Sequence, residues 1–116
     1  MVEAPRELKV WIYRKGNGGA YVFPPSPQLV KSGGNVTFQN LTTCMATVVF
    51  PEEGIVTLEG RPVSSFDVEP LPKGTAKTVT AVGPKGYYEY KVTLDCGDCG
   101  KYDAWASSDP GVIIDP

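Results

Sequence analysis

Short runs of alternating apolar and polar residues, broken by glycine and proline, constrain the fold of this chain more than any other feature. Thirteen glycines and eleven prolines interrupt a sequence of 116 residues. Between these breaks the apolar residues recur with a period of two, as in Leu8, Val10 and Ile12. No stretch keeps the 3.6-residue period of an amphipathic helix. Because alternate residues of a strand face opposite sides of a sheet, this pattern predicts strands and turns.

Seven segments have the composition and alternation of β-strands. They are residues 8–13, 21–23, 36–39, 48–50, 75–82, 87–94 and 112–114. The irregular stretch 54–72 predicts a long loop with a short strand or turn near Phe66 and Val68. Many short strands separated by turns predict an all-β fold, namely a two-sheet antiparallel sandwich with Greek-key connections.

The length and composition favour a single domain over residues 1–116. The net charge is only -2 and no basic stripe is present, so we expect no nucleic-acid partner. The longest apolar runs fall far short of the roughly 20 residues of a membrane helix, so we expect no membrane span. Met1 is followed directly by a polar, proline-containing segment, which indicates either a cytosolic protein or one whose signal segment has been removed.

Histidine is absent and cysteine occurs three times. The lack of histidine removes the commonest general base and the commonest metal ligand, which disfavours catalysis. The motif Cys96-Gly97-Asp98-Cys99 has a spacing that suits a disulfide, a metal site or a thiol redox pair. A strand precedes it and no helix is predicted after it, so the helix dipole that activates a redox cysteine is missing. Asp95 and Asp98 also oppose thiolate formation, which favours structural or inert cysteines over a redox enzyme.

Three segments of the sequence resemble the plastocyanin-like cupredoxins. They are LVKSGGNVTFQN at residues 29–40, VVFPEEG at residues 48–54 and GYYEY at residues 86–90. Together with the final segment 112–114 they span most of the chain, although they consist chiefly of β-sandwich patterning. The resemblance implies a cupredoxin-like sandwich.

The same resemblance implies that the usual copper ligands are missing. Cupredoxins hold type 1 copper with two histidines, a cysteine thiolate and usually a weak methionine. By position, the first histidine corresponds to Ala46 and the cysteine corresponds to Val92. The second histidine cannot be present anywhere in the chain. We therefore expect a cupredoxin-like domain without a type 1 copper centre.

The resemblance also implies that the three cysteines meet at one end of the domain. Cys44 lies in one ligand-bearing connection of the cupredoxins, and Cys96 and Cys99 lie in the other. A disulfide from Cys44 to Cys96 or Cys99 would close a loop of about 50 residues and stabilise the fold by roughly 4 kcal/mol. Alternatively, Cys44, Met45, Cys96 and Cys99 would offer soft ligands for Cu(I) or zinc. The sequence leaves the pairing and the metal alternative open.

These observations favour a copper-free, cupredoxin-like binding or structural module that is not an enzyme and has no cofactor. We expect it in the periplasm or outside the cell, because small sandwiches with a disulfide belong to oxidising compartments. A protein partner is expected at the loop end. Two alternatives remain, namely a Cu(I) or zinc protein and a thiol-disulfide protein that uses Cys96 and Cys99. The oligomeric state is left open.

The aromatic residues and two motifs that resemble N-glycosylation sites suggest further functions. Aromatic side chains are favoured at interfaces, but on alternating strands they pack more often in the core or in cross-strand pairs. The aromatic residues concerned are Trp11, Tyr13, Tyr87, Tyr88, Tyr90, Tyr102 and Trp105, of which Trp105 is expected to be exposed. The motifs beginning at Asn35 and Asn40 fit the N-glycosylation pattern, which matches by chance in many sequences.

Overall fold

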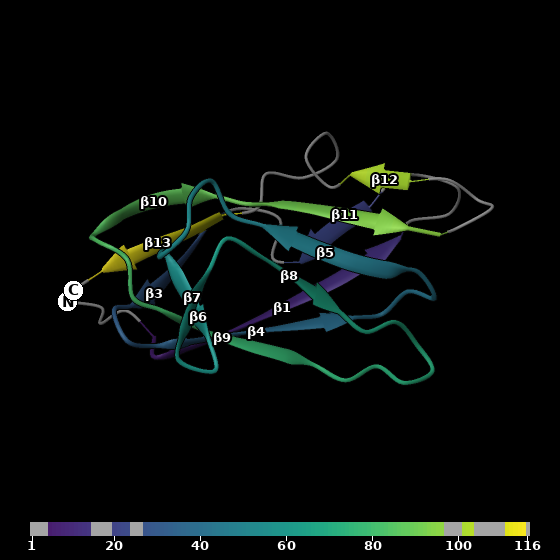
Figure 1. Cartoon of the computed structure of the whole chain (residues 1–116), viewed down its shortest axis with the longest axis horizontal. Helices are drawn as coiled ribbons and strands as arrows, with labels where there is room; N and C mark the ends of the chain where they lie inside the picture. Colours follow the sequence, from purple (N-terminus) through teal and green to yellow (C-terminus); the bar gives the residue numbers. More distant parts are fainter. Residues whose placement is uncertain (1–4, 15–19, 24–26, 97–100, 104–110, 116) are drawn as a thin grey trace.

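The computed structural model describes residues 5–14, 20–23, 27–96, 101–103 and 111–115. These residues form strands and connections, and none of them forms a helix (Figure 1). The first strands are β1 (Glu7–Arg14), β2 (Ala20–Phe23), β3 (Gln28–Lys31), β4 (Asn35–Asn40), β5 (Met45–Val49), β6 (Val56–Leu58) and β7 (Arg61–Val63). The later ones are β8 (Ser65–Val68), β9 (Lys77–Ala81), β10 (Gly86–Glu89), β11 (Lys91–Asp95), β12 (Lys101–Asp103) and β13 (Gly111–Asp115). The predicted all-β fold is confirmed.

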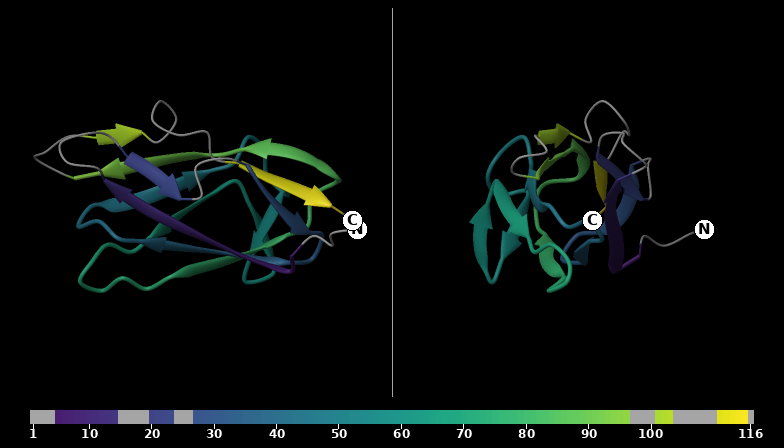
Figure 2. Two further views of the ribbon diagram at one scale, coloured as in Figure 1. Left: turned by 180° about the vertical axis from the view of Figure 1, so that it is seen from behind. Right: turned by 90° about the vertical axis from the view of Figure 1, so that its right-hand side faces the viewer.

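The strands form two layers around a common interior (Figure 1; Figure 2). The first layer is one sheet in the order β2-β1-β4-β9-β6-β7. The second layer consists of two hydrogen-bonded groups, β10-β13-β3 and β12-β11-β5-β8. The two groups belong to one layer because β10 continues into β11 with only Tyr90 between them. The predicted strand over residues 87–94 is therefore two strands that continue the same layer.

The prediction of purely antiparallel sheets is wrong at two strand pairs. β1 runs parallel to β4, with Leu8 opposite Val36, and β13 runs parallel to β3, with Ile114 opposite Val30. Between β1 and β4 the chain passes through β3, which lies in the other layer. Because the chain leaves the first layer and returns to it, β4 can enter beside β1 in the same direction.

The stretch 54–72 contains more structure than the predicted loop. It holds β6, β7 and β8, and the turn between β6 and β7 is made by Glu59 and Gly60, whose φ angles of 53° and 81° are both left-handed. Such a turn matches the twist of a short hairpin. Pro62 is tolerated within β7 because this strand is the edge of its sheet. The prolines and glycines that led us to expect a loop here thus belong in part to a hairpin at the edge of the sheet.

The core lies between the two layers and contains the inward-facing residues of almost every strand. Four aromatic rings occupy its middle: Phe38 lies 5.5 Å from Tyr90 and 5.3 Å from Phe66 between ring centroids, and Phe50 lies 5.3 Å from Tyr90. Val10, Ile12, Val22, Val30, Val36, Val48, Val56, Val79, Val92, Leu94, Val112 and Ile114 surround them. The alternation predicted for residues 8–12 and 88–94 is confirmed by this burial.

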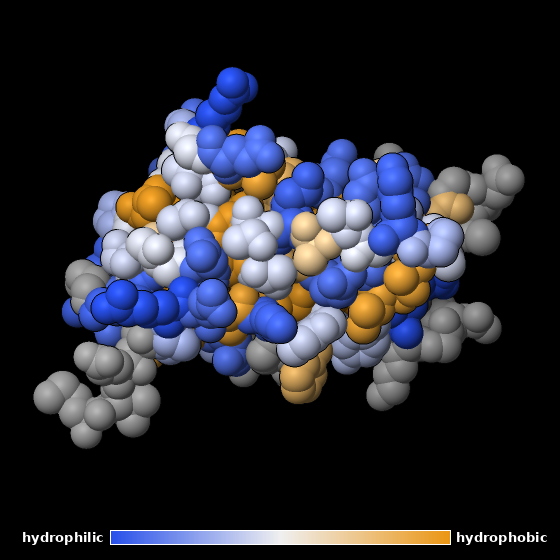
Figure 3. All heavy atoms as spheres, turned by 90° about the horizontal axis from the view of Figure 1, so that it is seen from below, coloured by the Kyte–Doolittle hydropathy of each residue, from blue (hydrophilic) through white to orange (hydrophobic). Residues whose placement is uncertain are grey.

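The described part of the chain contains no helix with the length and apolar character that a membrane crossing requires. Seen from the side on which β4 and β9 lie in Figure 1, the surface is mainly hydrophilic, and hydrophobic side chains reach it in separate patches (Figure 3).

Candidate functional site

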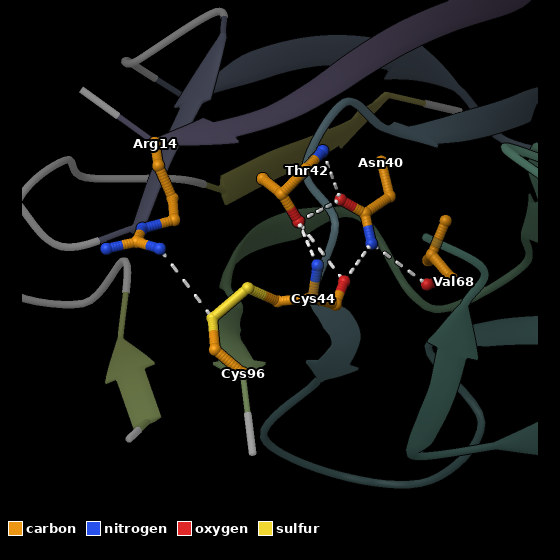
Figure 4. Close-up of a disulfide and its surroundings, with 6 residues drawn as sticks. All are labelled: Arg14, Asn40, Thr42, Cys44, Val68 and Cys96. Atoms are coloured by element: carbon orange, nitrogen blue, oxygen red, sulfur yellow. Dashed lines mark hydrogen bonds between the residues drawn. A yellow bond between two sulfur atoms is a disulfide. The ribbon is translucent and has the colours of Figure 1, made fainter. Parts of the chain in front are cut away.

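A disulfide between Cys44 and Cys96 joins two connections at one end of the sandwich (Figure 4). β5 and β11 are antiparallel neighbours, and their register places Met45 opposite Asp95. Cys44 immediately precedes β5 and Cys96 immediately follows β11, so the register brings them face to face. Their Cα atoms lie 4.5 Å apart, although 52 residues separate them in sequence. The prediction that Cys44 lies within bonding distance of Cys96 or Cys99 is confirmed for Cys96.

The other sulfur-bearing residues of the predicted site are placed differently. Met45 is half-buried in β5, and Cys99 lies outside the described residues. The bridge uses the sulfur atoms of Cys44 and Cys96, which the metal alternative requires as thiolates. Metal binding or a Cys96–Cys99 redox pair would therefore require this bridge to open first. Both alternatives stay predictions.

Ala46 and Val92, which the resemblance assigns to copper ligands, are both fully buried in the core. Ala46 lies between Leu94 of β11 and Val68 of β8, and Val92 lies opposite Val48. Each position is thus surrounded by aliphatic neighbours in the sheet. Apolar packing is what these two side chains provide in this structure.

A buried polar network supports the connection that holds Cys44 (Figure 4). The Asn40 side chain, which has no exposed surface, donates through Nδ2 to the carbonyl oxygens of Cys44 at 2.7 Å and Val68 at 3.2 Å. Its Oδ1 accepts from the backbone N–H of Thr42 at 2.9 Å and lies 2.7 Å from the Thr42 hydroxyl. The backbone N–H of Cys44 in turn donates to Thr42 Oγ1 at 3.1 Å. Asn40 therefore satisfies three backbone groups, two in the connection between β4 and β5 and one in β8.

The network has two consequences for the candidate site. Because its members are buried and hydrogen-bonded, they fix the path of the chain from β4 to β5 and so the position of Cys44. The glycosylation-like motif at Asn40 is also explained structurally, since Asn40 Nδ2 is buried and already donates twice in the folded protein. Asn35, at the start of β4, is exposed.

Arg14, the last residue of β1, extends towards the bridge (Figure 4). Its Nη1 atom lies 3.9 Å from Cys96 Sγ, which is a long contact between a charged donor and a sulfur acceptor. The first layer of the sandwich therefore reaches the disulfide through this side chain. Sequence reasoning did not single out Arg14.

Two exposed leucines lie at the same end of the domain. Leu41 is 47% exposed and Leu71 is 40% exposed. Their segments are joined by a hydrogen bond of 2.8 Å from the Leu71 backbone N–H to the Thr42 carbonyl. We call Leu41 and Leu71 the loop-end surface. It lies next to the buried network and the bridge, so its backbone is well supported.

Sequence reasoning missed the buried network as well as Arg14. The Asn40 and Thr42 pair carried a usable signal, because asparagine and threonine two residues apart often hydrogen-bond to nearby backbone in a turn. That signal does not tell a turn at the surface from a buried one. The partner carbonyl of Val68 comes from a distant strand, and nothing in the local sequence points to it.

No protein-family model matches the chain, and no curated protein matches it by sequence. Among solved structures, the chain is similar to the McoA multicopper oxidase from the hyperthermophile Aquifex aeolicus, with a TM-score of 0.43 and 10% sequence identity. The match covers 94% of this chain and 29% of the oxidase chain. The likeness concerns the fold, and nothing about copper or oxidation is transferred from it. What the structure itself defines is an all-β sandwich with a disulfide across one end.

Proposed function

We propose that this protein is a copper-free, cupredoxin-like binding or structural module that carries out no catalysis and binds a protein partner at its loop end. The observation that carries the proposal is the Cys44–Cys96 bridge, which closes the end where cupredoxins bind copper. Apolar Ala46 and Val92 fill two positions assigned to ligands. A disulfide and aliphatic packing there support a structural role in place of the metal.

The bridge also supports a location outside the cytoplasm. Disulfides persist in oxidising compartments such as the periplasm and the extracellular space, whereas cytosolic thiols are kept reduced. Cys44 is almost completely buried, which suits a structural disulfide better than one that is opened and closed in a reaction cycle. We therefore propose that the module acts in the periplasm or outside the cell.

The loop-end surface is the proposed contact with the partner. Leu41 and Leu71 expose apolar side chains on segments that the buried network and the bridge hold in place. A rigid backbone lowers the entropy that is lost when a partner binds, so exposed apolar side chains on such a backbone are favourable contacts. The partner contact is expected to centre on these leucines.

Site-specific photocrosslinking in the cells that produce the protein tests this contact. A photoreactive amino acid is placed at Leu41 or at Leu71. The control is the same replacement at Val82, which is 45% exposed and lies next to the turn that precedes β4, at the opposite end of the sandwich. A protein adduct of one defined mass from positions 41 and 71, but not from position 82, is expected. Equal adducts from all three positions, or none from 41 and 71, would contradict the proposed partner surface.

A further inference from the structure

Four aromatic side chains form a row on the outward face of β1 and β2. Trp11 is the register partner of Phe23, and Tyr13 is the register partner of Tyr21. Their ring centroids lie 6.1 Å and 5.6 Å apart, respectively, and the two tyrosine rings are stacked. We call these four residues the aromatic row. Seen from behind, β1 and β2 lie side by side on the near side of the molecule (Figure 2).

The row belongs to the surface and not to the core. The residues that alternate with it, Val10, Ile12 and Val22, are the buried ones on these strands. Phe23 is 54% exposed, and Trp11, Tyr13 and Tyr21 are half-buried. Cross-strand packing explains why the rings pair. It does not require that both pairs on this face be aromatic, since β-branched residues pack equally well across strands.

A groove lined by both polar and apolar side chains continues the row on the neighbouring strand. A hollow of about 180 Å³ lies beside Trp11, between β1 and β4, and Lys9, Thr37 and Gln39 line it. Gln39 donates through Nε2 to the Gly74 carbonyl, which orients its amide group. The aromatic row therefore adjoins side chains that can donate and accept hydrogen bonds.

We propose that the aromatic row and this groove bind a neutral carbohydrate chain. A sugar ring has an apolar C–H face that stacks on an aromatic ring, and its edge carries hydroxyl groups that need hydrogen-bond partners. Trp11 and Tyr13 supply the stacking surfaces, and Gln39 with Lys9 supplies partners for the hydroxyls. The site does not involve Leu41 or Leu71, so it stands or falls independently of the proposed protein contact.

The charge of the protein favours a sugar over a nucleic acid. Single-stranded nucleic acids also stack on aromatic rows, but they require a positively charged groove along the backbone. The chain carries a net charge of -2, the row itself is uncharged, and the groove contributes a single cation, Lys9, which falls short of a basic track along a nucleic-acid backbone. Tyrosine and tryptophan tips are polar, so the row suits a ligand with alternating apolar faces and hydroxyl edges better than a wholly apolar partner.

Affinity electrophoresis in native gels that contain mixed-linkage β-glucan, xylan, galactomannan or soluble starch tests the proposal. The variants are Trp11→Ala, Tyr13→Ala and Phe23→Ala, of which the last changes the most exposed ring and is least expected to disturb folding. Tyr87→Ala is the matched control, because Tyr87 is an equally exposed aromatic residue on β10 in the other layer. Circular dichroism and urea unfolding verify that each variant is folded.

We expect at least one polysaccharide to retard the wild-type protein. Trp11→Ala and Tyr13→Ala should weaken this binding at least about tenfold, Phe23→Ala should weaken it less, and Tyr87→Ala should leave it unchanged. Absence of retardation in all four gels, or retardation that the three row variants leave unchanged, would overturn the proposal. Binding of oligo-dT but of no polysaccharide, or a dimer that Phe23→Ala dissociates, would assign the row to a nucleic acid or to a second copy and would overturn it as well.

Discussion

Cys44 and Cys96 lie one residue beyond the last registered pair of β5 and β11, with their Cα atoms 4.5 Å apart. The strand register places the two cysteines opposite each other. The bond then fixes the ends of both strands to each other. Since 52 residues separate the two cysteines, the bridge restricts the unfolded chain far more than a Cys96–Cys99 bond would.

Removal of the bridge should destabilise the protein strongly. In the double variant Cys44→Ala, Cys96→Ala we expect the free energy of unfolding to fall by about 4 kcal/mol, because a closed loop of this length is lost from the unfolded state. Urea unfolding under non-reducing conditions measures the change. Cys99→Ala is the control and should leave the free energy of unfolding nearly unchanged. A double variant as stable as the wild type would show that the bridge is not a structural staple.

The buried network should be almost as important as the bridge. Asn40→Ala removes the donor of the buried Val68 carbonyl, one of two donors to the Cys44 carbonyl and the acceptor of the Thr42 N–H, and should lower the free energy of unfolding by about 3 kcal/mol. Asn35→Ala is the matched control, because Asn35 is exposed and accepts only from the exposed Thr80 hydroxyl. It should cost less than about 1 kcal/mol. Equal losses in chemical denaturation would contradict the role assigned to Asn40.

Tyr90 makes the stability depend on pH in the alkaline range. Burial raises the pKa of the Tyr90 hydroxyl above its usual value of 10.0. In the unfolded chain this hydroxyl loses its proton near pH 10, while in the folded protein it stays protonated. The stabilisation is therefore present below pH 10 and is lost above it, by up to about 1.4 kcal/mol per pH unit.

The variant Tyr90→Phe isolates this effect from other alkaline titrations. The free energy of unfolding of the wild type should fall more steeply than that of Tyr90→Phe between about pH 10 and pH 11. Urea unfolding at a series of pH values provides the comparison. Parallel curves for the two proteins would mean that Tyr90 ionises in the folded state as easily as in the unfolded one.

Copper should give no blue centre in this protein. The chain has no histidine, and Ala46 and Val92 are packed into the core. On addition of Cu(II) to the oxidised protein we expect no intense thiolate-to-copper absorption in the visible spectrum. A band of that kind would contradict the copper-free interpretation, whichever residues produced it.

The strand pattern was predictable from sequence because burial of one face of a strand imposes a period of two. This holds for β1 and β11, where residues that alternate along the strand are buried together on one face. It does not hold for residues 54–72, where β6 and β7 are too short to show a period and contain Pro62. The parallel pairs β1–β4 and β3–β13 depend on which layer β3 joins, and no local pattern encodes that choice.

The candidate site was predictable only in part. The meeting of Cys44 with the Cys96 region followed from the cupredoxin resemblance, but the choice between Cys96 and Cys99 depends on the register of β5 and β11. The outward position of Trp11 and Tyr13 also could not be predicted from the local pattern, because both faces of β1 carry large apolar side chains. Composition alone does not show which of these faces is turned to the core.

Disulfide mapping of the protein as purified, with free thiols alkylated first, tests the central claim most directly. Asp98 lies between Cys96 and Cys99, so a protease that cleaves before aspartate separates these two cysteines into different peptides. Mass spectrometry without reduction should find the Cys44 peptide linked to the Cys96 peptide, with Cys99 alkylated. A Cys96–Cys99 link would favour the thiol-disulfide alternative, and alkylation of all three cysteines would favour the metal alternative. Either result would contradict a cupredoxin-like module closed by a structural bridge at its loop end.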